Sequence, residues 1–345
     1  MSSIAFQKKD VMEEIKKKVN KFQNSEIIYP VILDIHPVMN QCNLNCGWCI
    51  GGESSDNTGI FLSFDQCREL LFSIFNINRQ YNWPLEIHIC GNNSEPLLNI
   101  EFIIEFLKFI NNRAIVKLIT NGILLNRLFP YINLVHEISI SLDVWSENQF
   151  IQLKGGSAAQ YQKIFSNIEH IKSQRELLGN PFPALYVSFV INEEFDKNEF
   201  LSFCIKLKRI GINHIQVRCN YYNNSINQIS IKTKIEEISK VLNGTNNTYL
   251  IYNNQNFDMK FNEYSDRIQE KGFECNAWHF WPVIAADYQL YPCAHVANRK
   301  YSNISIDLNK HMNYYSLFTS IPPFFCECCN ICPSMLNYIN HLLLQ

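Results

Sequence analysis

The sequence has 345 residues, of which 47% are hydrophobic and 18% are charged, and its formal net charge is −2. Apolar content this high supports a packed core and excludes a disordered or collagen-like chain. The small net charge gives no general attraction for nucleic acid or anionic lipid. No apolar run approaches the roughly 20 residues that span a bilayer, and residues 1–10 lack the apolar core of a secretory signal. We therefore expect a cytoplasmic protein without nucleic-acid or membrane partners.

The N-terminal segment, residues 1–28, predicts an amphipathic helix, because Val11, Ile15, Val19 and Phe22 share one helical face. From residue 29 onward, short β-branched runs alternate with helical patterns. The six predicted strands are residues 31–35, 85–90, 115–119, 137–142, 185–191 and 214–219. The helices predicted between them are residues 64–77, behind a Ser63-x-x-Gln66 capping box, then 101–110, 126–132, 158–172 and 198–210.

This alternation predicts an α/β fold with a parallel sheet and crossover helices. Six units suit a partial (β/α)6 TIM-like barrel better than a closed eight-stranded one. A further helix is predicted at residues 231–242, and an Asn-rich stretch at residues 243–256 marks the end of the periodic region. We expect the barrel to occupy residues 29–245 and a small cysteine-rich domain, with a hairpin at 280–294, to occupy residues 246–345.

The thirteen cysteines are the informative residues, since a reducing cytoplasm disfavours structural disulfides and makes clustered thiols candidate metal ligands. Cys42, Cys46 and Cys49 lie on one short stretch after the first predicted strand. A structural zinc site takes four ligands, whereas an iron–sulfur cluster held by three thiolates keeps one iron open to another ligand. Three thiols therefore favour an iron–sulfur cluster with an open iron.

The pattern C-x3-C-x2-C, with Trp48 before its last cysteine, resembles the signature of the radical SAM superfamily. The resemblance implies a [4Fe-4S] cluster on the three cysteines, with S-adenosylmethionine (SAM) at the fourth iron. It also implies that one electron cleaves SAM and yields a 5′-deoxyadenosyl radical, which takes a hydrogen atom from an unactivated C–H bond. Cofactors carry such chemistry because no side chain can start it. An electron donor of the flavodoxin or ferredoxin type is implied as well.

Other segments resemble the SAM-binding motifs of this superfamily, each at the carboxyl end of a predicted strand, where βα folds place site residues. Gly91-Asn-Asn-Ser94-Glu95-Pro96 resembles a Gly-Gly-Glu-Pro segment that receives the SAM ammonium group, although its second glycine is replaced. Thr120-Asn121-Gly122 and Ser139-Ile-Ser141-Leu-Asp143 resemble segments that line the SAM site, with Ser141 and Asp143 as ribose contacts. The expected cofactor-binding residues are Trp48, Gly91, Ser94, Glu95, Pro96, Thr120, Asn121, Ser141, Asp143, Asn192 and Arg218.

Asn192 and Arg218 follow or end the fifth and sixth strands, and Arg218 is a candidate partner of a SAM or substrate carboxylate, with a surface ion pair as the alternative. Cys90 and Cys219 also end predicted strands. There a thiol could return a hydrogen atom to a substrate radical, as some radical SAM epimerases require, and a core role is the alternative. Single imidazoles such as His88 are interpreted as structural.

A second set of cysteines lies near the C-terminus. Cys275 and Cys293 flank the predicted hairpin, and Cys329 and Cys332 form a C-x2-C pair. This arrangement resembles the twitch domain, a shortened SPASM extension, and implies one auxiliary [4Fe-4S] cluster on these four thiols. Tetrahedral zinc is the alternative metal, because four thiolates suit it equally well. The alternative ligands are Cys326 and Cys328.

The resemblance implies an oxidoreductase or peptide-modifying enzyme of natural-product biosynthesis. We expect it to epimerise or crosslink a ribosomally made peptide (a RiPP). The alternative is a dehydrogenase or epimerase of a small-molecule substrate, a sugar or aminocyclitol. No fused peptide-recognition domain is expected before the barrel, so a leader peptide would be bound elsewhere. The alternative from another class is a non-catalytic zinc-binding or electron-transfer protein.

Overall fold

The computed structural model describes residues 8–24, 30–49, 58–81, 85–91, 93–111, 113–180, 182–191, 195–219, 228–243, 250–252, 273–276, 279–297, 305–310, 317 and 325–326. In these ranges the chain has a mixed α/β fold around one large, mostly parallel sheet. The order of strands in that sheet is β13-β12-β11-β1-β4-β5-β6-β7-β8-β9. The predicted fold class, α/β with a parallel sheet, is confirmed at this level.

Adjacent strands from β1 to β9 in this order run parallel. These strands are β1 (Ile32–His36), β4 (Glu86–Ile89), β5 (Ile115–Thr120), β6 (Glu137–Ser141), β7 (Ala184–Ile191), β8 (His214–Cys219) and β9 (Leu250–Tyr252). The first six agree with the predicted strands. Strand β9, which pairs with β8, was not predicted, and it lies after residue 245, the predicted end of the barrel. The division into three domains stays a prediction.

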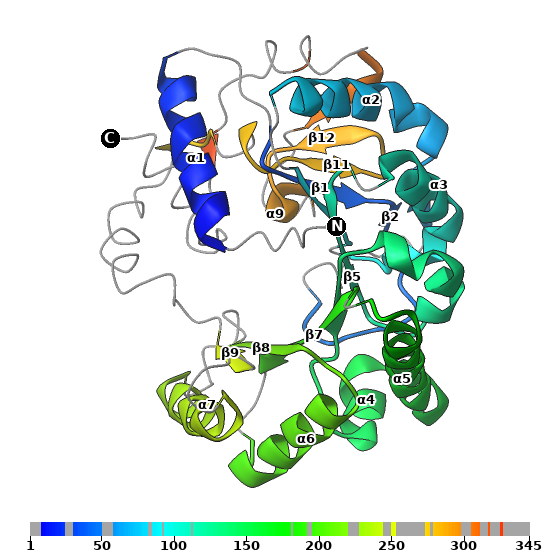
Figure 1. Ribbon diagram of the computed structural model, residues 1–345, viewed down its shortest axis with the longest axis vertical. Coiled ribbons are helices and arrows are strands. Elements are labelled where there is room, and N and C mark those ends of the chain that lie inside the picture. Colours follow the sequence, from blue (N-terminus) through cyan, green and yellow to red (C-terminus); the bar gives the residue numbers. More distant parts are fainter. Residues whose placement is uncertain are drawn as a thin grey trace.

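The helices follow the outer side of the curved sheet from α2 to α7 (Figure 1). They are α1 (Lys8–Gln23), α2 (Phe64–Tyr81), α3 (Ile100–Ile110), α4 (Glu147–Lys154), α5 (Ala158–Leu178), α6 (Lys197–Arg209), α7 (Gln228–Asn243) and α9 (Ala294–Ala297). The 3-10 segments are η1 (Pro96–Asn99), η2 (Leu125–Leu134) and η4 (Leu308–Lys310). The predicted α-helix at 126–132 is thus 3-10, and Pro130 within it lacks the N–H of a regular helical turn.

Local hydrogen bonds explain where several of these helices begin and end. At the start of α2 the Ser63 backbone N–H donates to Gln66 Oε1 (3.2 Å), which is one of the two bonds of the predicted capping box. Helix α5 has the complete box, formed by Ser157 and Gln160. It ends at Gly179, whose φ of +59° lies in the left-handed region that favours glycine.

The two faces of the parallel strands differ in polarity. Alternate residues such as Leu33, Ile87 and Val116 belong to the main hydrophobic core, which also contains apolar residues of α2, α3 and α5. Most of the residues between them on β1, β4, β5 and β6 carry polar side chains. This polar face includes Asp34, His36, Glu86, His88, Lys117, Glu137, Ser139 and Ser141. The fold therefore presents a polar surface on the side of the sheet away from the helices.

The predicted hairpin is present and extends the main sheet. Strands β11 (Val283–Ala285) and β12 (Gln289–Tyr291) are antiparallel, and β11 runs parallel to β1, with Asp34 opposite Val283. Strand β13 (Ile306–Asp307) follows β12 in the sheet. The N-terminal helix α1 packs beside this region, because the Phe22 ring lies 4.8 Å from that of His279.

Two small antiparallel pairs complete the described strands. Strand β2 (Val38–Met39) pairs with β3 (Ile60–Phe61), and β10 (Phe273–Glu274) pairs with β14 (Phe325–Cys326). Strand β2 lies directly before the three-cysteine segment in the chain, and β3 lies after it. Among the described helices, none combines the length and the apolar character needed to cross a membrane.

Replacing Ile138 by alanine tests the assignment of the two faces. Ile138 lies on β6 in the main core and is fully buried. We expect Ile138→Ala to lower the free energy of unfolding by about 2–5 kcal/mol, since it removes methyl groups from a packed core. Its neighbour Ser139 lies on the polar face, so Ser139→Ala should change that free energy by less than about 0.5 kcal/mol. Urea denaturation measures both, and equal effects would contradict the assignment.

Candidate functional site

The three cysteines of the C-x3-C-x2-C segment lie on one loop after β2, called here the cysteine loop (residues 40–49). Cys42 is exposed, and Cys46 and Cys49 are half-buried. The Cys49 backbone N–H donates to the Cys46 carbonyl (3.0 Å), which closes a turn around the last two cysteines. One short loop therefore carries three accessible sulfur ligands.

The carboxyl end of α4 holds the cysteine loop in place. The Asn45 N–H donates to the Lys154 carbonyl (2.9 Å), and the Gly47 N–H donates to the Leu153 carbonyl (3.2 Å). Carbonyls in the last turn of a helix have no partner within the helix, so they are available to the loop. Gly155 ends α4 with a φ of +64°, and a Cβ at that position would lie 3.2 Å from the Asn45 Cβ. A glycine there lets the loop approach the helix.

Lys154 connects this helix end to the end of β6. Its side chain is 2% exposed. The ammonium group donates to the carbonyls of Ser141 (2.6 Å) and Leu142 (3.1 Å), and it lies 3.0 Å from Asp143 Oδ2. Asp143 Oδ1 accepts a hydrogen bond from the Val190 N–H (2.9 Å). Both carboxylate oxygens of Asp143 thus have partners within the protein, and its expected contact with ribose stays a prediction, as does that of Ser141.

Glu95 joins the ends of β4 and β5. Its side chain is 1% exposed. Glu95 Oε1 accepts hydrogen bonds from Thr120 Oγ1 (2.6 Å) and the Leu97 N–H (3.1 Å), and Oε2 accepts one from the Asn121 N–H (2.8 Å). Burial raises the pKa of the Glu95 carboxyl, while the hydrogen bonds from Thr120, Asn121 and Leu97 oppose that rise. The structure thus brings together three of the predicted residues.

Asn121 reaches from β5 to the cysteine loop. Its side-chain NH2 donates to Asn43 Oδ1 (2.5 Å) and lies 3.9 Å from the Cys42 sulfur. In the part of the chain that the structure describes, the buried Nδ2 of Asn43 has no hydrogen-bond partner. The predicted residue Asn121 is therefore a neighbour of a predicted metal ligand, and it is joined there by Asn43, which the sequence did not single out.

The segment after β4 packs against β2. The Ser94 hydroxyl donates to the Val38 carbonyl (2.6 Å), and the Glu95 N–H donates to the Gln41 carbonyl (3.1 Å). A Cβ on Gly91 would lie 2.1 Å from Ser94 Oγ and 2.8 Å from the Ser94 carbonyl oxygen, so only glycine fits this path. Pro96 follows as the first residue of η1.

Burial also affects the thiols of the cysteine loop. It raises the pKa of Cys46 to about 12, although the nearby ammonium of Lys154 opposes the rise. The pKa of Cys42 is raised as well, because its thiol loses hydration although the residue as a whole is exposed. Metal ligation needs thiolates, so a metal that binds these residues must displace their protons.

The remaining predicted residues have different positions. Trp48 is half-buried and packs against the main core, and Cys90 is buried directly after β4. Arg218 and Cys219 are the last two residues of β8, opposite Val190 and Ile191 of β7. Asn192 lies outside the described residues. The cofactor and hydrogen-donor roles expected for these residues stay predictions.

The C-terminal cysteines are described only in part. Cys275 and Cys293 are buried and follow β10 and β12 in the chain. Cys326 belongs to β14 and is opposite Phe273, two residues before Cys275. Cys328, Cys329 and Cys332 lie outside the described residues. The ligand set expected for a second cluster stays a prediction.

Sequence patterns did not indicate that Lys154 belongs to this site. A lysine in the last turn of a helix is usually solvated and interacts favourably with the helix dipole. The eight-residue helix α4 that carries it was not predicted either. Only the folded chain brings Lys154 between Asp143 and the cysteine loop.

Comparisons with known proteins found similarity only among solved structures. No protein-family model matches the sequence, and no curated protein matches it. The structure of Streptococcus suis SuiB bound to S-adenosylmethionine aligns with a TM-score of 0.61 and 14% identity over 93% of this chain and 71% of that chain. SuiB bound to precursor peptide SuiA aligns with a TM-score of 0.58 and 15% identity over 93% and 74%. The chain and SuiB therefore share a fold.

Replacing Lys154 by methionine tests the connection between β6 and α4. We expect Lys154→Met to lower the free energy of unfolding by about 3–5 kcal/mol, since it leaves the buried Asp143 carboxylate without its cation. The double variant Lys154→Met/Asp143→Asn should lose less than the sum of the two single losses. Urea denaturation gives all three values.

The exposed pair Lys172 and Glu176 provides the control. Lys172→Met should lower the free energy of unfolding by less than about 1 kcal/mol, because solvent screens an exposed pair. A loss for Lys154→Met no larger than that of Lys172→Met would contradict the assigned role of Lys154.

Proposed function

We propose that the protein is a radical SAM enzyme that holds a [4Fe-4S] cluster on Cys42, Cys46 and Cys49 and reductively cleaves SAM. The observation that carries this proposal is the cysteine loop itself, which presents three cysteines and places Cys42 beside Asn121, a hydrogen-bond partner of Glu95. The shared fold with SuiB, which was crystallised with SAM, supports it.

The donor set fits the proposed cluster. Iron–sulfur clusters are held by cysteine thiolates, and three thiolates leave one iron for another ligand. When bound, the cluster supplies the electron that cleaves SAM to methionine and a 5′-deoxyadenosyl radical, which abstracts hydrogen from a C–H bond. The helix end of α4 and its two hydrogen bonds to Asn45 and Gly47 keep the loop in one conformation before any cofactor binds.

Glu95 is proposed to orient SAM through its ammonium group. An ionised carboxylate has about four acceptor positions, and the protein uses three of them on Glu95. One acceptor position remains for a donor of the ligand. The charge on this buried carboxylate gives a cationic ligand group a stronger interaction than the same contact has in water.

Asn121 and Lys154 are proposed to adjust the electrostatics of the cluster. Hydrogen bonds to sulfur ligands shift the reduction potential of iron–sulfur clusters. The Asn121 NH2 lies 3.9 Å from the Cys42 sulfur. The ammonium of Lys154 is close enough to lower the pKa of Cys46 against the effect of burial, so it favours the thiolate that ligation needs.

Finer features of the fold also belong to this proposal. We propose that residues 29–245 form a partial (β/α)6 TIM-like barrel, in which the polar face of the sheet is the inner surface. The C-terminal cysteines would hold one auxiliary [4Fe-4S] cluster, with Cys275 and Cys293 as ligands beside Cys329 and Cys332. The buried positions of Cys275 and Cys293 support this ligand set. A flavodoxin or ferredoxin would supply the electron, and thiols of this kind remain reduced in the cytoplasm.

A peptide is the proposed substrate class. One of the two SuiB structures that share this fold holds precursor peptide SuiA. The enzyme would epimerise or crosslink a ribosomally made peptide, and Cys219, at the end of β8, would be the hydrogen-atom donor in an epimerisation. Cys90, directly after β4, is the alternative donor where its sulfur binds no metal.

Anaerobic reconstitution with iron and sulfide tests the chemistry. We expect the reduced protein to convert SAM to 5′-deoxyadenosine, detected by chromatography, and to bind about eight iron atoms per chain if both clusters form. The triple variant Cys42→Ala/Cys46→Ala/Cys49→Ala should lose about four iron atoms and all 5′-deoxyadenosine formation.

The matched control is Cys67→Ala, which removes a buried thiol on α2 that donates to the Phe64 carbonyl (3.4 Å). This variant should keep the iron content and the 5′-deoxyadenosine of the original chain. A reconstituted wild-type protein that binds iron but forms no 5′-deoxyadenosine would refute the proposed reaction. Retention of all iron in the triple variant would refute the proposed ligands.

Glu95→Gln tests the proposed SAM contact. Removing the charge should weaken SAM binding about 10- to 100-fold, since a hydrogen bond to a charged group contributes about 1.5–3 kcal/mol. Calorimetric titration of the reconstituted protein measures this affinity, and the iron content should not change. The control Glu101→Gln removes an exposed carboxylate at the start of α3 and should leave SAM affinity unchanged. Equal affinities of the two variants would count against the contact.

A further inference from the structure

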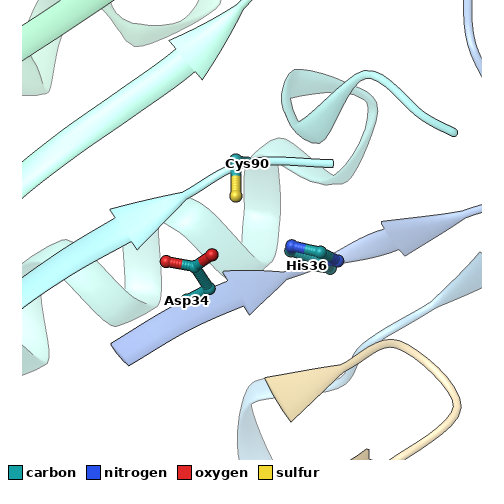
Figure 2. Close-up of side chains that lie close together, drawn as sticks. All are labelled: Asp34, His36 and Cys90. Carbon is teal, nitrogen blue, oxygen red and sulfur yellow. The ribbon is translucent and has the colours of Figure 1, made fainter. Parts of the chain in front are cut away.

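Three different metal-binding side chains converge at the ends of β1 and β4. Asp34 and His36 lie on β1, and Cys90 directly follows β4 (Figure 2). All three belong to the polar face of the sheet, since the residues between them, such as Ile35 and Ile89, are in the main core. A carboxylate oxygen of Asp34, a ring nitrogen of His36 and the Cys90 sulfur lie within 4.8 Å of one another.

This cluster is buried, and one of its polar atoms lacks a partner. The exposed fractions are 5% for Asp34, 3% for His36 and 7% for Cys90. In the described part of the chain, His36 Nε2 is buried and makes no hydrogen bond. A buried imidazole nitrogen without a partner loses its hydrogen bonds to water and gains none in the protein, which costs free energy. Native proteins therefore rarely keep such a nitrogen unless a ligand binds to it.

The carboxylate of Asp34 is already oriented by its neighbours. Asp34 Oδ1 accepts a hydrogen bond from Trp281 Nε1 (2.6 Å), and His88 Nδ1 lies 3.1 Å from the same oxygen. His88 is held in turn through its other nitrogen, which lies 2.6 Å from Glu86 Oε1. Among the described residues these contacts use Oδ1, so Oδ2 stays available to a ligand.

We propose that Asp34, His36 and Cys90 bind one divalent transition-metal ion of the zinc class. Zinc binds thiolate, imidazole and carboxylate ligands, at about 2.0–2.3 Å from the metal. Ligand atoms around such an ion lie about 3.3–3.8 Å apart, so the three atoms, which lie within 4.8 Å of one another here, would approach by at most about 1–1.5 Å when the ion binds. Trp281 and His88 orient the carboxylate as the supporting groups of zinc sites commonly do.

The proposed metal would have a coordination position left for a further ligand. Catalytic zinc sites have three protein ligands and keep the fourth position for water or substrate. Here the chain continues from Cys90 into the segment that carries Glu95, and from His36 into the cysteine loop. Because the cluster is buried, a water molecule is the oxygen ligand that fits this position. The metal site itself does not depend on the proposed cluster or on SAM.

Zinc analysis of the full-length protein tests this proposal. Zinc per chain is measured by mass spectrometry after growth in zinc-supplemented medium, and X-ray absorption at the zinc edge gives the ligand atoms. We expect wild-type protein to hold about one zinc with one sulfur at about 2.3 Å and nitrogen or oxygen at about 2.0 Å. His36→Gln, Asp34→Asn and Cys90→Ser should each lose this ion.

The control is Cys204→Ser, which alters a buried thiol on α6 and should keep the zinc of the wild-type chain. Circular dichroism melting identifies variants that fold, and one folded variant among the three suffices for the comparison. Zinc that persists in folded His36→Gln, or a wild-type shell of three or four sulfurs, would overturn the proposal. Wild-type protein without zinc would overturn it as well.

The readout separates this inference from the proposed function. Neither zinc content nor the absorption spectrum requires SAM cleavage. A chain that binds zinc as expected and forms no 5′-deoxyadenosine would therefore refute only the radical chemistry, and a chain that forms 5′-deoxyadenosine without zinc would refute only the metal site.

Discussion

The buried ammonium group of Lys154 is the constraint on which the site depends. It lies between the last carbonyls of β6 and the carboxylate of Asp143, and the backbone of its own helix end holds the cysteine loop. A buried cation is tolerated only where nearby oxygens replace its hydration, and three oxygens do so here. The position of α4, and with it the path of the loop, therefore depends on one ion pair and a few hydrogen bonds, in addition to the packing of Phe150 in the core.

Glu95 is a second buried charged residue that holds the cysteine loop, and it lies on the side of Cys42 and Asn121. Its carboxylate collects donors from its own segment and from the end of β5, so two neighbouring strands share one acceptor. Asn121 then continues from this network to Cys42. The cysteine loop is thus framed by a buried cation at one end and a buried anion at the other, both belonging to the protein. Contacts of this kind order a loop before a ligand binds, and such preorganisation reduces the entropy lost on binding.

Much of the fold could be predicted from the sequence because its strands are long and periodic. The strands of the sheet from β1 to β8 have β-branched runs that alternate with amphipathic helices. The short strand β9 has three residues in an Asn-rich context, and α4 has a single short helical pattern, so neither gave a clear signal. In η2, Pro130 prevents the regular α-helix that its apolar residues indicate. The residues of the site differ in the same way. Some belong to local sequence motifs and could be predicted, namely Cys42, Cys46, Cys49 and Glu95. Others come together only through contacts between distant segments, namely Lys154, Asn43 and the cluster of Asp34, His36 and Cys90.

The polar face of the sheet has a consequence for how this protein can change. The ammonium group of Lys117 lies 2.8 Å from the Glu86 carboxylate and 3.6 Å from that of Glu137. Burial lowers the pKa of His88, but the neighbouring carboxylates of Asp34 and Glu86 outweigh this effect and raise its pKa to about 9. Negative and positive groups thus alternate across four adjacent strands at neutral pH. Replacing one of them by a neutral residue leaves two like charges as neighbours or one charge uncompensated. We therefore expect these charged residues to change in evolution by paired substitutions, in which residues of adjacent strands are replaced together.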